Sequence, residues 1–458
     1  MYPGGKADGG DEKEGFAAGD GLPLRGWRPG TDCHPGKGRS MRPEEGSPGS
    51  APESSPSLRG DWPTPGRAGC RLAEALLRSL FLVLLLGIFL LPARASAAEK
   101  AIRVGLFAPL RGSGEELGQQ VLQGATLAVE RVNRQGGVKG TKIELIVRDD
   151  ASDVRRSLQS MRDLADKERC LAVIASPQGP AVLATMAIAN EKQVPLLVPC
   201  PLQDITRRGN RWVFRVGPYP QLEAACVASF AVQELGWRRV ALLYQKDESG
   251  KEGMKLLSQA FRRLGPPPAV TEPFDPADTD FTILVSKVLK RQPDGVAVWA
   301  SPREAGRLVR RLREWGYRGV IVGPSELSDP QFLEVAGEAS HNTVFASPLF
   351  SANRVPEGTP FSQAFHARYG SEPQPAAASG YDAIMLMAEA LRGLTFRDRK
   401  SLRDSLAKID NCELAHGIYS FLSSTGDGLK SLPLVTYLHH RLVLMRDLYR
   451  PDPRTLRP

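Results

Sequence analysis

The chain has 458 residues, of which 24% are charged, and a formal net charge of +9. This length is enough for two to three domains if all of it folds. Six cysteines are too few for a disulfide-stapled scaffold of this size. The first 70 residues hold 16 glycines and 10 prolines but no isoleucine or valine. Because such a segment buries little apolar surface, we predict that residues 1–70 are disordered.

An uncharged apolar run follows between Arg78 and Arg94. Its fifteen residues, 79–93, are short for a membrane span, which needs about 20. Basic residues precede the run, and the small-residue site Ala95-Ser96-Ala97 follows it. This order is typical of a secretory signal peptide, so we predict one at residues 71–97, cleaved after Ala97. An uncleaved membrane anchor is the alternative. A signal peptide is normally preceded by only a short segment, so the 70 residues before it suggest that translation starts further downstream and that residues 1–70 are a start-site artefact.

The predicted mature chain, residues 98–458, keeps a net charge of +8. A small excess spread over two domains favours a soluble protein and does not indicate nucleic-acid binding. The remaining cysteines follow no metal-ligand spacing, and their scarcity fits a bacterial periplasm. They are Cys170, Cys200, Cys226 and Cys412.

Strand and helix patterns alternate from residue 101 onward. Apolar residues at three- and four-residue spacing indicate helices, and short apolar runs between them indicate buried strands. This order predicts a parallel sheet with helices on both faces. We predict strands at 102–107, 142–147, 171–174 and 194–198, and helices at 117–132, 153–166 and 180–192.

The alternation begins again after Gly217-Pro218, which predicts a second unit of the same α/β class. The final part of the chain is mostly helical and ends in short strand patterns. We predict helices at 220–235, 250–263, 302–315, 360–369, 381–394 and 402–408, and strands at 239–244, 295–299, 320–322, 434–437 and 442–445. The segment 281–290 leads into the strand at 295–299.

Catalytic, nucleotide and metal motifs are absent from the sequence. The glycine-rich turn at 112–118 has the spacing GxGxxxG, one residue too long for a dinucleotide fingerprint, and its glutamates would repel a pyrophosphate. His439 and His440 are adjacent, so on a strand they would point to opposite faces. The arginines of helix 302–315 fit a solvated basic face. We therefore predict a protein that is not an enzyme and has no cofactor or metal.

Several segments resemble the periplasmic solute-binding proteins of the leucine/isoleucine/valine-binding type. The resemblance runs from about residue 101 to 445. It is carried by IRVGLFAPLRGSGEELGQQVLQGATLAVERVN (102–133), GGVKGTKIELIVRDDASD (136–153), QVPLLVPCPLQDITRRGNRWVFRVGP (193–218), DTDFTILVSKVLKRQPDGVAVWAS (278–301) and the GYDA helix at 380–383.

The resemblance implies a type I periplasmic-binding-protein fold, in which two doubly wound parallel-sheet lobes are joined by three crossover segments. Lobe 1 would comprise residues 98–218 and 348–428, and lobe 2 residues 219–347 and 429–458. The crossings would fall near 217–219, 346–350 and 425–432. Such proteins trap a ligand between the lobes by hinge closure, and a membrane transporter recognises the closed state.

The resemblance also implies a set of ligand-binding positions. In lobe 1 the family's hydroxyl positions fall on Gly179 and Leu202. In lobe 2 the acid that pairs with the ligand ammonium falls on Ser325 or the adjacent Glu326. A carboxylate could still be held by backbone N–H groups at Gln178 and Gly179. The candidate ligand-binding residues are Leu117, Gln178, Gly179, Pro201, Leu202, Tyr219, Ser249, Ser301, Ser325 and Glu326.

These observations predict an exported, monomeric periplasmic binding protein. It would capture a small polar ligand, such as an amino acid or a related carboxylate, and deliver it to the permease of an ABC importer in the inner membrane. The alternative is a ligand-sensing or envelope-regulatory protein on the same two-lobe scaffold with no transport role. No nucleic-acid partner is expected.

Overall fold

The structure is a computed structural model that describes residues 101–202, 205–206, 209–265, 267–348, 359–422 and 426–456. The predicted disordered segment at 1–70 and the predicted signal peptide at 71–97 lie outside these residues, as do parts of the second and third predicted crossings. Within the described ranges, no helix combines the length and the apolar character that crossing a membrane requires.

The first sheet has five strands in the order β2-β1-β3-β4-β5, and every neighbouring pair is parallel. All residues of β3, β4 and β5 are buried, as expected for strands covered on both faces. The strands are β1 (Ile102–Ala108), β2 (Ile143–Asp149), β3 (Ala172–Ile174), β4 (Leu196–Val198) and β5 (Val213–Arg215).

Helices cover both faces of the first sheet. The helices α2 (Glu115–Arg134) and α11 (Pro375–Arg392) contribute to one buried cluster, and α3 (Val154–Arg162) and α4 (Gly179–Glu191) contribute to another. The contact between α2 and α11 is close, because a Cβ at Gly124 would lie only 1.8 Å from the carbonyl oxygen of Ala377. Two more helices, α10 (Pro360–Tyr369) and α12 (Arg399–Leu406), pack against α2 and α11 respectively.

The second sheet has seven strands in the order β14-β13-β10-β9-β8-β6-β7. Neighbouring strands from β10 to β7 are parallel, whereas β13 is antiparallel to both β10 and β14. The strands are β6 (Val240–Gln245), β7 (Val270–Phe274), β8 (Gly295–Trp299), β9 (Ile321–Gly323), β10 (Thr343–Ala346), β13 (Leu432–Leu438) and β14 (Arg441–Tyr449).

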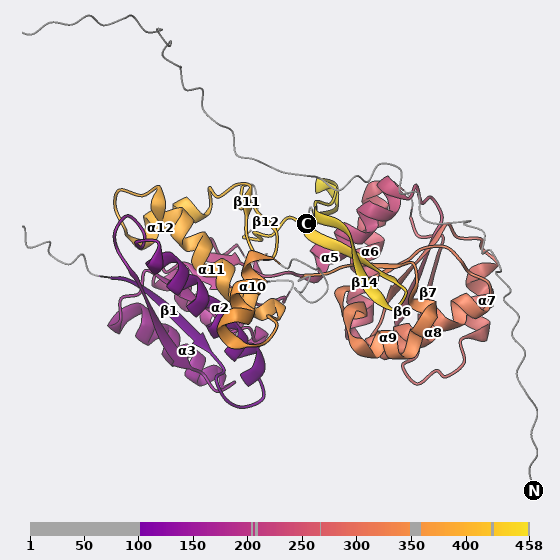
Figure 1. Cartoon of the computed structure of the whole chain (residues 1–458), viewed down its shortest axis with the longest axis horizontal. Helices are drawn as coiled ribbons and strands as arrows, with labels where there is room; N and C mark the ends of the chain where they lie inside the picture. The colour runs from indigo at the N-terminus through magenta and orange to yellow at the C-terminus, as the bar shows by residue number, and fades with distance from the viewer. Residues whose placement is uncertain are drawn as a thin grey trace, which may run out of the picture. The chain divides into compact units, whose positions relative to one another are not determined.

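Helices also cover both faces of the second sheet, which completes the predicted doubly wound arrangement. Figure 1 shows α8 and α9 next to each other, and both belong to the buried cluster on one face, together with α7. The cluster on the other face contains α5 and α6. The helices are α5 (Pro220–Ser229), α6 (Glu248–Leu264), α7 (Thr282–Leu289), α8 (Pro302–Glu314) and α9 (Pro330–Ala336).

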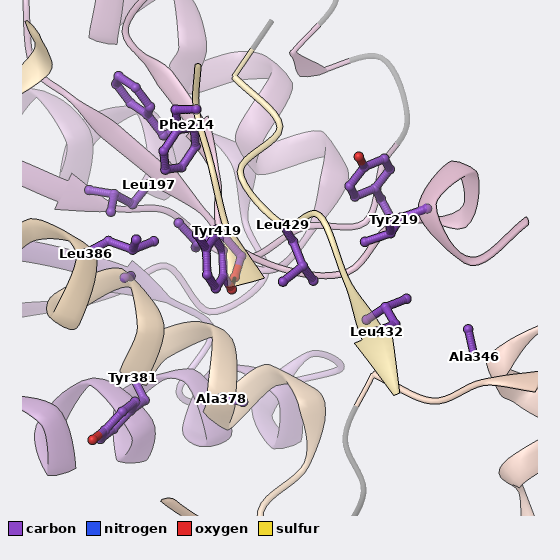
Figure 2. Packing of buried hydrophobic residues seen from close by; sticks show 14 of the residues in the cluster. Leu197, Phe214, Tyr219, Ala346, Ala378, Tyr381, Leu386, Tyr419, Leu429 and Leu432 are labelled. Atoms are coloured by element: carbon purple, nitrogen blue, oxygen red, sulfur yellow. Dashed lines mark hydrogen bonds between the residues drawn. The ribbon is translucent and has the colours of Figure 1, made fainter. Parts of the chain in front are cut away.

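Three segments connect the sheets, as the fold class predicts. The first follows β5, the second leaves β10 and leads to α10, and the third enters β13 from the side of the short hairpin β11 (Cys412–Glu413) and β12 (Ile418–Tyr419). The third runs beside the end of β5, because the Arg215 N–H donates to the Gly426 carbonyl at 2.8 Å. Figure 2 shows buried side chains along the first and third segments: Tyr219 at the start of α5, Tyr419 on β12, Leu429 before β13 and Leu432 at the start of β13.

The paired histidines lie between two strands, as the predicted strands at 434–437 and 442–445 imply. His439 and His440 form the two-residue turn between β13 and β14, with φ angles of 46° and 60°. Both residues therefore have the left-handed conformation of a tight hairpin turn, in which side chains do not alternate between sheet faces.

Candidate functional site

The loops after the first three strands meet at the carboxyl edge of the first sheet. The backbone N–H of Gly114, after β1, donates to the Ser152 hydroxyl at 3.1 Å, and the Gln178 amide, after β3, donates to the same hydroxyl at 3.3 Å. Below them Asp150 is fully buried and accepts from the Ser157 hydroxyl at 3.0 Å. Burial raises the pKa of Asp150. Ser152 thus holds the predicted residue Gln178 against the loop after β1.

The beginning of α4 is apolar on the side where a ligand would approach. Gly179 is the first residue of α4 and Pro180 follows, so the second position has no N–H. A Cβ at Gly179 would lie 3.3 Å from Cδ2 of Leu202, which places the Leu202 side chain over the helix start. The structure therefore brings the predicted residues Gln178, Gly179 and Leu202 together.

Two other predicted residues of this lobe lie near the same loops in sequence, and both are exposed. Leu117 is in the first turn of α2 and is 46% exposed, which is high for a leucine. Pro201 is also exposed and precedes Leu202. The structure gives no direct contact between either residue and Gln178.

A second polar group lies where β6 and β8 end. The backbone N–H and the hydroxyl of Ser301 donate to Oε1 of Gln245 at 3.0 and 2.7 Å, and the hydroxyl also contacts Glu304. The amide of Gln245 donates to Asp247, which caps α6 by accepting from the Gly250 N–H at 2.8 Å. The prediction missed Gln245, although its place at the end of a buried strand was a usable signal. The predicted Ser249 lies in the first turn of α6 and is exposed.

A third group joins two predicted residues to one that the prediction missed. The Ser325 N–H, in the 3₁₀ turn Ser325–Ser328 after β9, donates to Oε2 of Glu223 at 3.0 Å. Glu223 lies on α5 and is 7% exposed. Desolvation, with a smaller contribution from the Glu326 charge, raises the pKa of Glu223 to about 8. Desolvation also raises the pKa of Glu326, although this side chain is exposed, so we assign the larger effect to Glu223.

Tyr219 lies in the first crossing and is only 2% exposed. The guanidinium of the fully buried Arg215 lies 4.9 Å from the centre of its ring. Nε of Arg215 donates to Asp427 at 2.8 Å, and Nη1 donates to the Cys200 carbonyl at 3.4 Å, in the loop that carries Pro201 and Leu202. Sequence reasoning missed Arg215, because a charged residue at the end of a strand does not predict burial.

The side chains at these strand ends are suited to binding a ligand through hydrogen bonds and charge. The described residues contain no cluster of three or more histidine, cysteine or acidic side chains suited to a metal ion. Their four cysteines are unpaired thiols. Hydrogen-bonding and acidic groups instead gather after β1 and β3 of one sheet and after β6, β8 and β9 of the other. In doubly wound proteins, ligands bind at such carboxyl edges.

Fold and site together define a ligand-binding protein built from two α/β lobes. The sequence profile of the periplasmic binding protein family matches residues 101–437. The chain therefore belongs to this family of binding proteins, which are not enzymes, and has a solute-binding role towards a small molecule.

Individual relatives agree with this assignment. A Leu/Ile/Val-binding protein homologue from Brucella melitensis is 28% identical over 275 residues, which is 60% of this chain and 74% of that one. The leucine-, isoleucine-, valine-, threonine- and alanine-binding protein of Pseudomonas aeruginosa is 23% identical over 347 residues, 76% of this chain and 92% of that one.

Solved structures show the same fold. A crystal structure from Rhodospirillum rubrum has a TM-score of 0.71 at 25% identity and covers 75% of this chain and 100% of that one. The branched-chain amino acid transporter substrate-binding protein LivJ of Streptococcus pneumoniae, in complex with isoleucine, has a TM-score of 0.54 at 25% identity, with 76% and 100% covered.

Proposed function

We propose that the protein is an exported solute-binding component of an ABC importer. It captures a small polar ligand between its lobes and delivers it to a permease in the inner membrane. The single observation that carries this proposal is the pair of polar edges: hydrogen-bonding side chains gather at Ser152 and Gln178 on one sheet and at Ser301 and Ser325–Glu326 on the other. A ligand that contacts both edges stabilises the closed state, which the transporter can recognise.

The predicted signal peptide at 71–97 supports export to the periplasm, where the protein acts as a monomer. The Pseudomonas aeruginosa relative is named for binding leucine, isoleucine, valine, threonine and alanine, and LivJ was solved with isoleucine, which supports an amino acid or a related small ligand here. Two positions differ in chemistry from that expectation, since Gly179 and Leu202 stand where hydroxyl groups are expected. These departures favour a ligand whose polar groups differ from those of a branched-chain amino acid.

A thermal-shift screen of the purified protein tests the proposal. The panel consists of amino acids, amides, amines and small carboxylates. A ligand at about 100 times its dissociation constant adds about 2.7 kcal/mol to the free energy of unfolding, which gives a clear rise in melting temperature. A screen in which no compound raises the melting temperature would contradict a solute-binding role for this cleft.

If an amino acid does respond, the variant Glu326→Gln tests how its ammonium group is bound. The affinity of this variant for the amino acid should be at least tenfold lower than that of the wild type, because a charge-assisted hydrogen bond to the ammonium group is lost. Glu334→Gln on α9 is the matched control, because Glu334 is exposed and lies on a different element of the same lobe. Equal affinity in the Glu326 variant and the wild type would remove Glu326 from the site.

A further inference from the structure

Glu223 is a buried acid with no basic partner among the residues that the structure describes. It lies one turn into α5, where every residue from Gln221 to Ser229 is buried. Its carboxyl accepts a hydrogen bond from the Ser325 N–H at 3.0 Å, and the charge that acts on it comes from Glu326. Among the ion pairs of the described residues, none includes Glu223 or Glu326. Two carboxyl groups therefore flank one serine, and no cation from the described part of the chain neutralises them.

This arrangement is costly for the empty protein. A buried carboxyl group loses its hydration, and a second acid nearby opposes ionisation further. An apolar or amide side chain of similar size on α5 would avoid both costs. A residue that carries these costs beside a proposed binding edge is expected to have a functional role, because a bound cation can offset the cost of ionising its carboxyl.

The first lobe provides a second, independent observation. The start of α4 offers few hydrogen-bond donors to an anion, because Pro180 has no N–H and the Leu202 side chain covers Gly179. A carboxylate placed there would lose water and gain few donors. The carboxyl edge of the second sheet therefore carries acidic side chains, whereas the carboxyl edge of the first sheet offers few hydrogen-bond donors to an anion.

We propose that Glu223 is a second acidic residue of the binding site, and that the ligand is a small amine cation that needs no carboxylate for binding. The ammonium group lies next to Ser325, where it donates to Glu223 and Glu326. The apolar start of α4, with Leu202, contacts the rest of the ligand. This inference rests on the proposed solute-binding function and narrows its ligand class.

Matched sets of three compounds test the ligand class. The sets are alanine, ethylamine and propanoate, and leucine, 3-methylbutylamine and 4-methylpentanoate. In each set the amine lacks the carboxylate of the amino acid, and the carboxylic acid lacks its amino group. Thermal shift and titration calorimetry at pH 7 should show that the wild type binds an amine at least as tightly as its amino acid, whereas the carboxylates give no response.

Two variants test the residues. Glu223→Gln should weaken amine binding at least tenfold, equivalent to about 1.4 kcal/mol, while Glu334→Gln binds as the wild type does. The amide that replaces the Glu223 carboxyl can still accept from the Ser325 N–H, so this variant should fold, and a cooperative melting curve checks it. Glu326→Gln provides the same test at an exposed position and should also weaken amine binding.

The outcomes separate the two proposals. If an amino acid or a carboxylate binds but its matched amine does not, or if Glu223→Gln binds the amine unchanged, the inference is overturned and the solute-binding function stands. If no compound of these sets or of the wider panel binds the wild type, the proposed function fails and this inference fails with it.

Discussion

At the scale of single residues, Glu223 makes the stability of the protein depend on pH. Burial raises the pKa of its carboxyl to about 8, against an ordinary value of 4.5. Between these values the unfolded chain has released the proton, whereas the folded chain still holds it. The free energy of unfolding therefore falls as pH rises from about 4.5 to about 8 and is level above that, with a total loss on the order of a few kcal/mol.

The variant Glu223→Gln removes this titration. We expect its unfolding free energy, measured by urea denaturation, to be less dependent on pH between 5.5 and 8 than that of the wild type, and to be higher at pH 8. Glu334→Gln should keep the wild-type pH dependence. Parallel pH profiles for the wild type and the Glu223 variant would show that Glu223 ionises as freely as an exposed acid.

Sequence reasoning had no means to find Glu223 or Arg215. Both are charged residues in buried surroundings, and their partners are distant: Ser325 is 102 residues from Glu223, and Asp427 is 212 residues from Arg215. Spacing along the chain cannot reveal such pairs. The resemblance supplied Gln178 and Leu202 because they follow strands directly, where loop order alone places them on one edge.

At the scale of elements, the alternation of strands and helices was predictable, and short or irregular elements were not. The strands β5, β7 and β10, the short hairpin β11–β12 and the helix α9 were missed. Both β5 and β10 have four residues or fewer, and β7 is an edge strand that contains Pro273 and alternates between exposed and buried residues. The helix α11 begins at Pro375, earlier than predicted, because Pro375 is accommodated in its first turn.

The contact between α2 and α11 gives a prediction at this scale. In Gly124→Ala the new Cβ would lie 1.8 Å from the Ala377 carbonyl oxygen, which is backbone and cannot rotate away. We expect a loss of about 1–3 kcal/mol, measured by urea denaturation, because the two helices must separate. Gly393→Ala at the end of α11 is the control, because its Cβ contacts nothing closer than 4.0 Å. Similar stability of the two variants would show that the helix contact is adaptable.

At the scale of the whole molecule, the crossings connect two sheets, and the proposed function requires that they also allow a hinge to move. Arg215 lies at the end of β5 with no exposed surface, and Asp427, in the third crossing, accepts from its Nε at 2.8 Å. Thr206 donates to the same carboxylate at 2.8 Å. Since Arg215 also donates to the Cys200 carbonyl, this network joins two crossings to the loop that carries Leu202. We therefore expect it to act as a fixed pivot and not as part of the moving surface.

Removing Asp427 tests the pivot. Asp427→Ala leaves the Arg215 guanidinium without its carboxylate, and breaking such a buried pair costs about 3–5 kcal/mol. Asp427→Asn should cost less, because its amide oxygen can still accept from Nε. Glu144→Ala, which breaks the exposed pair with Arg103, should cost about 1 kcal/mol or less. Urea denaturation ranks the three variants, and a loss of unfolding free energy in Asp427→Ala no greater than in Glu144→Ala would contradict the pivot.

A fixed pivot also predicts that Asp427→Asn keeps the wild-type affinity for any ligand identified in the screen, because the network positions the loop without contacting the ligand.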